Sequence, residues 1–176
     1  QAGTPPPVEE RLPADPMVIE PIAEVGNYCG TWLRCETNPG HVGARLGAEP
    51  LVMWDRDAQT IIPNLAYKWD VSEDGKEFTF YLRQGVRWSD GEPFTADDIT
   101  FWFDDVVMNA ELSPAFPNWL KAGGEPCTVA KVDDYAVKFT FTSPAALCLD
   151  NMAFSGNSII NYSKHYLKQF HTDYAD

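Results

Sequence analysis

Residues 69–82 read WDVSEDGKEFTFYL and carry the clearest structural signal in the chain. Alternation of apolar and polar residues is typical of a strand with one buried face, and an Asp-Gly step favours a tight turn. Both occur here, so the stretch predicts a β-hairpin that turns at residues 72–76. Its apolar positions are Trp69, Val71, Phe78, Phe80 and Leu82.

The same period of two returns near residue 135. A turn at Asp133-Asp134 follows Val132 and leads into a second strand. The apolar positions of that strand are Tyr135, Val137, Phe139 and Phe141. The pattern predicts a further strand that packs one face against the core.

Between these hairpins, residues 95–108 predict a helix. Thr95 is a favourable N-cap, and Asp98 stands three residues later, where an acidic side chain can reach back to the cap. Apolar residues then recur at helical spacing, at Ile99, Trp102, Phe103, Val106 and Val107. Residues 163–170 predict a short amphipathic helix. Strands and helices are mixed and hairpins are prominent, so the predicted fold class is α+β.

The first 21 residues predict an extended arm, because six prolines interrupt any periodicity. These are Pro5, Pro6, Pro7, Pro13, Pro16 and Pro21.

Charge excludes several functions. The chain has 176 residues with 13 Lys and Arg against 26 Asp and Glu, a formal net charge of −13. Binding to nucleic acid or to an anionic membrane surface draws on clustered cations, which this composition lacks. No apolar run approaches the roughly 18–20 residues that span a bilayer.

Catalytic and metal-binding patterns are missing as well. The sequence contains no P-loop, no G-x-G-x-x-G and no G-x-S-x-G element. Acids at positions 97, 98, 104 and 105 are interpreted as a solvated helix face. The three histidines complete no metal-ligand set with the cysteines, so we expect neither a metal nor another cofactor.

Four cysteines leave two alternatives open, disulfides or buried free thiols. Cys29 and Cys35 lie six residues apart, and Cys127 and Cys148 lie 21 apart. Four cysteines allow three pairings, of which pairing the neighbours is the simplest. Disulfides are favoured over buried thiols and would place the protein in an oxidising compartment.

Trp119 lies in a proline-broken segment after the helix, outside any periodic face. An aromatic residue on an ordered loop is a candidate for stacking on a ligand. The alternative is that Trp119 covers the end of the helix.

Three consecutive stretches resemble a known family signature. Residues 61–75 read IIPNLAYKWDVSEDG, residues 78–91 read FTFYLRQGVRWSDG, and residues 93–99 read PFTADDI. This order is similar to that of the family 5 extracellular solute-binding proteins, the receptors of ABC importers for peptides, nickel complexes and some oligosaccharides. The resemblance extends from about Val25 to Tyr174.

The resemblance implies a fold and a division into segments. It implies a periplasmic-binding-protein type II-like fold, represented by the N-terminal part of a first lobe and its inserted subdomain. Residues 1–24 would be the Pro-rich tether, residues 25–49 the start of the first lobe, and residues 50–166 the subdomain. Residues 167–176 would return towards the first lobe, and the C-terminal second lobe would be absent from this chain.

The resemblance also implies a non-enzymatic function. The protein would capture peptides or oligosaccharides for an ABC permease, in the periplasm or outside the cell, and could be lipid-anchored. The alternatives are a secreted hydrolase, or an accessory, structural or interaction domain. Family loops point to ligand contacts at Asn38, Gly40, His41, Phe116, Trp119, Ser155 and Asn157.

Overall fold

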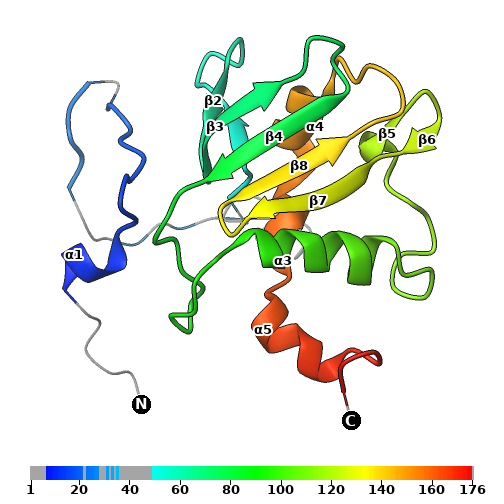
Figure 1. Ribbon diagram of the computed structural model, residues 1–176. Coiled ribbons are helices and arrows are strands. Elements are labelled where there is room, and N and C mark those ends of the chain that lie inside the picture. The colour runs from blue at the N-terminus through cyan, green and yellow to red at the C-terminus, as the bar shows by residue number, and fades with distance from the viewer. Residues whose placement is uncertain are drawn as a thin grey trace.

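The computed structural model describes residues 7–21, 23–27, 31, 33, 35 and 49–175. Its centre is a four-stranded antiparallel sheet in the order β3-β4-β8-β7. The strands are β3 (Ala66–Val71), β4 (Glu77–Leu82), β7 (Thr128–Asp133) and β8 (Ala136–Thr140). Figure 1 shows the sheet with the helices beside it, so the predicted α+β class is confirmed.

The hairpin at residues 69–82 and the strand after residue 134, both predicted from the sequence, are present. β3 pairs with β4, and β7 pairs with β8. The first hairpin turns at Gly75, whose φ of 67° lies in the region that glycine enters at little cost. β4 and β8 then join the two hairpins, with Phe80 opposite Val137.

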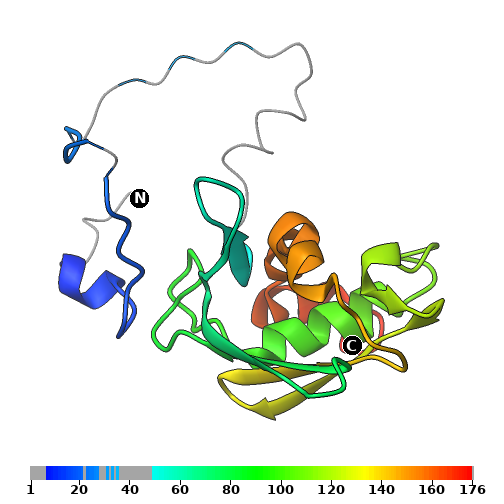
Figure 2. The same ribbon diagram turned by 90° about the horizontal axis from the view of Figure 1, so that it is seen from above.

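The alternation of side chains places one sheet face in the core and the other in solvent. Phe80 and Phe139 are fully buried, and their rings meet edge to face with centroids 5.7 Å apart. On the opposite face, the Tyr81 hydroxyl donates to Asp70 (2.8 Å), and the Lys68 ammonium lies 4.0 Å from the Tyr81 ring centre. Figure 2 shows the main helices gathered on one side of the sheet.

The predicted helix has its expected beginning and a different second half. α3 (Ala96–Phe101) starts at Thr95 with the predicted capping box, and its continuation η1 (Trp102–Val107) is π-helical. The apolar stripe is buried as predicted, because Ile99 is fully buried and Trp102 is 2% exposed. Ile99, Trp102, Phe103 and Val107 all belong to the buried core, so the stripe stays buried across the change to π-helix.

Smaller elements complete the helical layer. α4 packs beside the β1–β2 ribbon, and α5 packs beside α3. The predicted helix at residues 163–170 is present as α5 and η4. The elements are β1 (Val52–Trp54), β2 (Ile61–Pro63), η2 (Asn118–Leu120), β5 (Lys121–Ala122), β6 (Glu125–Pro126), α4 (Cys148–Ser155), η3 (Gly156–Asn161), α5 (Lys164–Leu167) and η4 (Lys168–Phe170). No helix among the described residues is both long and apolar enough to cross a membrane.

The N-terminal arm differs from the predicted extended chain in one place. α1 (Val8–Arg11) forms a single helical turn after Pro7. Proline suits the start of a helix, and Glu9 and Glu10 in the first turn favour that end. The turn ends at Leu12, which is extended because it precedes a proline.

Arg83 holds the following part of the arm against the sheet domain. Its guanidinium donates to the backbone oxygen of Asp15 and forms an ion pair with that residue's carboxylate at 3.1 Å. The Ala14 amide donates to the Gln84 carbonyl at 2.9 Å. This part of the arm therefore lies along the domain surface.

Candidate functional site

A pocket of about 300 Å³ opens where α4 begins. We call it the Trp119 pocket. Its wall combines an indole, an ammonium group and a carboxamide with apolar side chains, which is the usual make-up of a small-molecule site. Its lining residues are Trp119, Lys121, Ala122, Phe141, Pro144, Ala145, Ala146, Leu147, Cys148 and Asn151.

Aromatic contacts fix the position of Trp119. Its ring stacks on Trp102 with centroids 6.1 Å apart and an interplanar angle of 22°. Phe116, from the same loop, meets Phe103 edge to face at 6.2 Å. Trp119 thus covers the helix, which was one of the two alternatives predicted from the sequence. It also lines the pocket, as the ligand-stacking alternative requires. A pocket wall supported by core residues is held rigidly, which lowers the entropic cost of binding.

Lys121 brings charge to the same region. Its ammonium nitrogen lies 5.7 Å from the centre of the Phe116 ring, and the residue lines the Trp119 pocket. Lys121 therefore lies between the Phe116 ring, which is outside the pocket lining, and the Trp119 pocket. Aromatic rings and a cation can together stack a flat or apolar group and attract an oxygen-rich one.

The other predicted ligand contacts are not in this pocket. Asn38, Gly40 and His41 lie outside the described residues. Ser155 ends α4, seven residues and about 10 Å along the helix from Cys148, and its carbonyl accepts from the Ser158 hydroxyl (3.1 Å). Asn157 is exposed in η3. Asn151 was missed by the sequence analysis, because a lone polar residue on a short helix carries no local signal.

Cys127 and Cys148 are both buried in the core and are free thiols in the structure. The two residues are thus unbridged in the structure, and the bridge predicted from their spacing stays a prediction. Burial raises the pKa of the Cys127 thiol to about 12, and burial also raises the pKa of Cys148. Cys29 lies outside the described residues, so its predicted pairing with Cys35 stays a prediction.

The acidic helix face is only partly solvated, which corrects the sequence interpretation at Asp98. Its side chain is buried because it accepts from two backbone amides, those of Thr95 and Lys164, each at 2.9 Å. Asp97 instead forms an ion pair with Lys131 (2.7 Å), and Asp134 lies 2.6 Å from the same ammonium group. Hydrogen bonds to Asp134 and Asp97 raise the pKa of Lys131.

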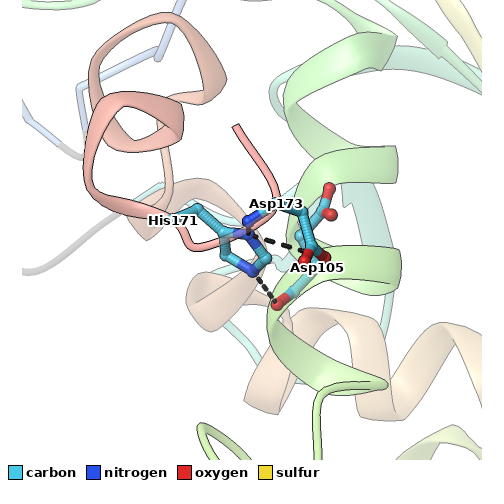
Figure 3. Close-up of side chains that lie close together, drawn as sticks. All are labelled: Asp105, His171 and Asp173. Carbon is cyan, nitrogen blue, oxygen red and sulfur yellow. Dashed lines mark hydrogen bonds and ion pairs between the residues drawn. The ribbon is translucent and has the colours of Figure 1, made fainter. Parts of the chain in front are cut away.

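One cluster could hold a metal ion. Donor atoms of Asp105, His171 and Asp173 all lie within 4.8 Å of one another. Figure 3 shows His171 and Asp173, on the segment after η4, facing Asp105 of η1. Sequence spacing did not indicate this cluster, because 66 residues separate Asp105 from His171.

Solved structures of similar shape are periplasmic binding proteins. An oligopeptide-binding protein OppA matches 97% of this chain and 26% of its own, with a TM-score of 0.86 and 42% identity. The periplasmic binding protein MelB from Agrobacterium fabrum C58, in complex with stachyose, matches 76% of this chain and 21% of its own, with a TM-score of 0.63 and 34% identity. The class that these likenesses define is the solute-binding protein.

The chain belongs to the bacterial extracellular solute-binding proteins of family 5, whose middle region matches residues 60–175. The periplasmic alpha-galactoside-binding protein of Rhizobium meliloti is 34% identical over 80% of this chain and 24% of its own length. The dipeptide-binding protein of Escherichia coli is 41% identical over 60% of this chain and 22% of its own length. The chain thus spans about a quarter of the length of these relatives.

Proposed function

We propose that the chain is part of the substrate-binding component of an ABC importer, which captures peptides or oligosaccharides outside the cytoplasmic membrane. The likeness to an oligopeptide-binding protein over 97% of the chain carries this proposal. Relatives named as periplasmic support the location. Neither the relatives nor the structures named above support the hydrolase alternative.

The proposed mechanism is closure of two lobes around the ligand, with a hinge that shields the ligand from water. In this scheme residues 1–24 form the tether of a lipid-anchored protein, residues 25–49 begin the first lobe, and residues 50–166 form its inserted subdomain. Residues 167–176 return towards the first lobe, and a C-terminal second lobe supplies the opposite wall. ABC permease subunits then receive the ligand.

The Trp119 pocket is the proposed contribution of this segment to ligand contact. Its indole and the neighbouring Phe116 ring are compatible with stacking on a sugar ring or an aromatic peptide side chain. Lys121 can pair with a carboxylate, such as a peptide's C-terminus, or donate to sugar hydroxyls. The ligand contacts at Asn38, Gly40, His41, Ser155 and Asn157 are proposed from family resemblance alone.

The test is a thermal-shift and tryptophan-fluorescence screen of the chain against dipeptides, longer peptides and stachyose, run beside hydrolase assays on the same compounds. We expect saturable shifts at millimolar ligand that Trp119→Phe and Lys121→Ala weaken. Gln59→Ala, at an exposed position outside both the pocket and the proposed contacts, serves as the control. Turnover without a saturable shift would contradict the proposal.

A further inference from the structure

His171 is the buried member of the Asp105, His171 and Asp173 cluster. Its side chain is 7% exposed, whereas that of Asp173 is 76% exposed. The His171 ring stands on the segment that follows η4 and packs edge to face against Phe101 at 6.2 Å. The ring orientation is therefore fixed by packing, as a rigid ligand requires.

Hydrogen bonding assigns the tautomer of this imidazole. His171 Nε2 lies 3.1 Å from the backbone oxygen of Asp105, which can only accept, so Nε2 carries the proton. Nδ1 then carries the lone pair, which accepts a hydrogen bond from the Asp173 amide (3.3 Å) and lies 3.8 Å from the Asp173 carboxylate, so a metal ion at Nδ1 would take the place of that amide. A ring N–H held by a backbone carbonyl is the usual second-shell arrangement of a metal-binding histidine.

The charge around Nδ1 is unbalanced. Donor oxygens of Asp105 and Asp173 lie within 4.8 Å of a His171 ring nitrogen and of each other, and Asp104 adjoins Asp105 in the chain. Tyr174 donates to both carboxylate oxygens of Asp105 at 3.1 Å, so one oxygen can keep that bond while the other turns to a cation.

The geometry points to a divalent transition-metal site in which His171 Nδ1, Asp105 and Asp173 bind Zn²⁺ and water completes the tetrahedron. One imidazole with two carboxylates is a nitrogen and oxygen set that suits zinc better than calcium or magnesium. Ligands 2.0–2.2 Å from zinc lie about 3.4 Å apart. The donor atoms now lie within 4.8 Å of one another, and rotation of the exposed Asp173 side chain can shorten this to the ligand spacing of zinc. The bound ion would fasten the segment after η4 to η1.

The experiment measures zinc binding by the 176-residue chain, freed of metal by a chelator and alkylated at its exposed Cys35 thiol. Competition with a zinc-sensitive dye gives affinity and stoichiometry, and Co²⁺ absorption reports tetrahedral ligation. Asp173→Asn removes a ligand oxygen and keeps the backbone amide at Nδ1. Asp104→Asn makes the same charge change beside the site without removing a ligand. Circular dichroism establishes that both variants fold.

We expect one Zn²⁺ per chain, with affinity at least about tenfold lower in Asp173→Asn and changed less than about threefold in Asp104→Asn. Asp105→Asn should weaken binding as Asp173→Asn does. Absence of stoichiometric zinc binding would overturn the site. Binding that Asp173→Asn leaves unchanged would also overturn it, because the zinc would then be an adventitious ion bound elsewhere. Equal losses of affinity in the Asp173 and Asp104 variants would show that diffuse negative charge, and not a defined site, attracts the ion.

Discussion

Asp98 joins two distant segments through one carboxylate. One oxygen accepts from the Thr95 amide and the other from the Lys164 amide, each at 2.9 Å. The first bond caps α3, and the second attaches the start of α5 to it. Because the side chain is only 4% exposed, water cannot replace either acceptor when it is removed.

Replacing Asp98 with Ala should therefore lower the free energy of unfolding by about 3 kcal/mol, since it removes a cap and leaves buried donors unpaired. Asp98→Asn keeps an acceptor oxygen and should cost less. Urea denaturation gives both values. Asp104→Ala, an exposed acid on the same helix, should stay within about 0.5 kcal/mol of the parent. Equal losses at Asp98 and Asp104 would contradict the bridging role.

The buried thiols predict a pH dependence. The pKa of the Cys127 thiol is raised from 9.0 to about 12 by burial, so the folded state resists ionisation that the unfolded state permits. The contribution of the buried, neutral Cys127 thiol to stability should be complete below about pH 9 and should be lost as the pH rises towards 12.

Alkylation measures the same burial. In the reduced protein at pH 8, Cys127 and Cys148 should react with iodoacetamide only after denaturation, whereas the exposed Cys35 reacts at once. Protein prepared without reductant gives a second result. If its denatured form has no alkylatable Cys127 or Cys148, the bridge predicted from spacing forms in solution and replaces the buried-thiol arrangement.

At the scale of elements, η1 is supported by the loop that follows it. Trp102 lies mid-stripe and is 2% exposed, while Trp119 stacks on it from outside. Trp102→Ala should lower stability by about 3–5 kcal/mol because it opens a core cavity. Trp119→Ala should lower stability by less than Trp102→Ala does. The loss should still exceed that of an alanine substitution at a loop residue without such contacts, because it removes the stacked aromatic pair.

Thermal melting of both alanine variants, with Trp119→Phe as the control that keeps a ring on Trp102, checks this order. A Trp119→Ala protein as stable as the parent would show that the stack contributes nothing. A loss equal to that of Trp102→Ala would place Trp119 fully in the core.

Within the described residues, the arm contacts the domain at few points, of which Arg83 makes the most. The others are the Ala14 amide on the Gln84 carbonyl and the Arg56 guanidinium on the Glu20 carbonyl. Arg83 donates to the Asn64 carbonyl at 2.6 Å and also binds the Asp15 backbone. Arg83→Ala should release the arm, and limited proteolysis between Pro13 and Pro21 should become faster. Asp15→Ala removes only the exposed ion pair and should change cleavage little. Equal cleavage of the Arg83 variant and the parent would contradict the docking.

Local sequence patterns predicted the helices and strands, but they did not predict which distant residues contact one another. The first hairpin, the strand after the Asp133-Asp134 turn and the Thr95–Asp98 capping box follow from neighbouring residues, since period two and a cap are local features. The burial of Asp98 was not predictable, because its second partner lies 66 residues away. The Trp102–Trp119 stack and the His171 cluster depend on the same kind of long-range contact, which no local spacing records.

At the scale of the whole molecule, the chain belongs to the family 5 solute-binding proteins and spans about a quarter of the length of its relatives. A ligand held between two lobes loses most of its contact area when only one wall is present. Each loss of about 1.4 kcal/mol weakens binding tenfold. The 176-residue chain alone should thus bind any ligand weakly, although its own core lets it fold.

The most direct test is calorimetric titration of dipeptides and stachyose into the isolated chain, and into a chimaera in which this chain replaces the matching segment of the Escherichia coli dipeptide-binding protein. The two proteins are 41% identical over 120 residues, which favours a folded chimaera. We predict that the chimaera saturates at ligand concentrations well below the millimolar range in which the isolated chain binds, and that Trp119→Ala weakens binding by the chimaera. Tight binding by the isolated chain, or a folded chimaera that binds none of these ligands, would contradict the claim that this chain forms one wall of a two-lobe binding site.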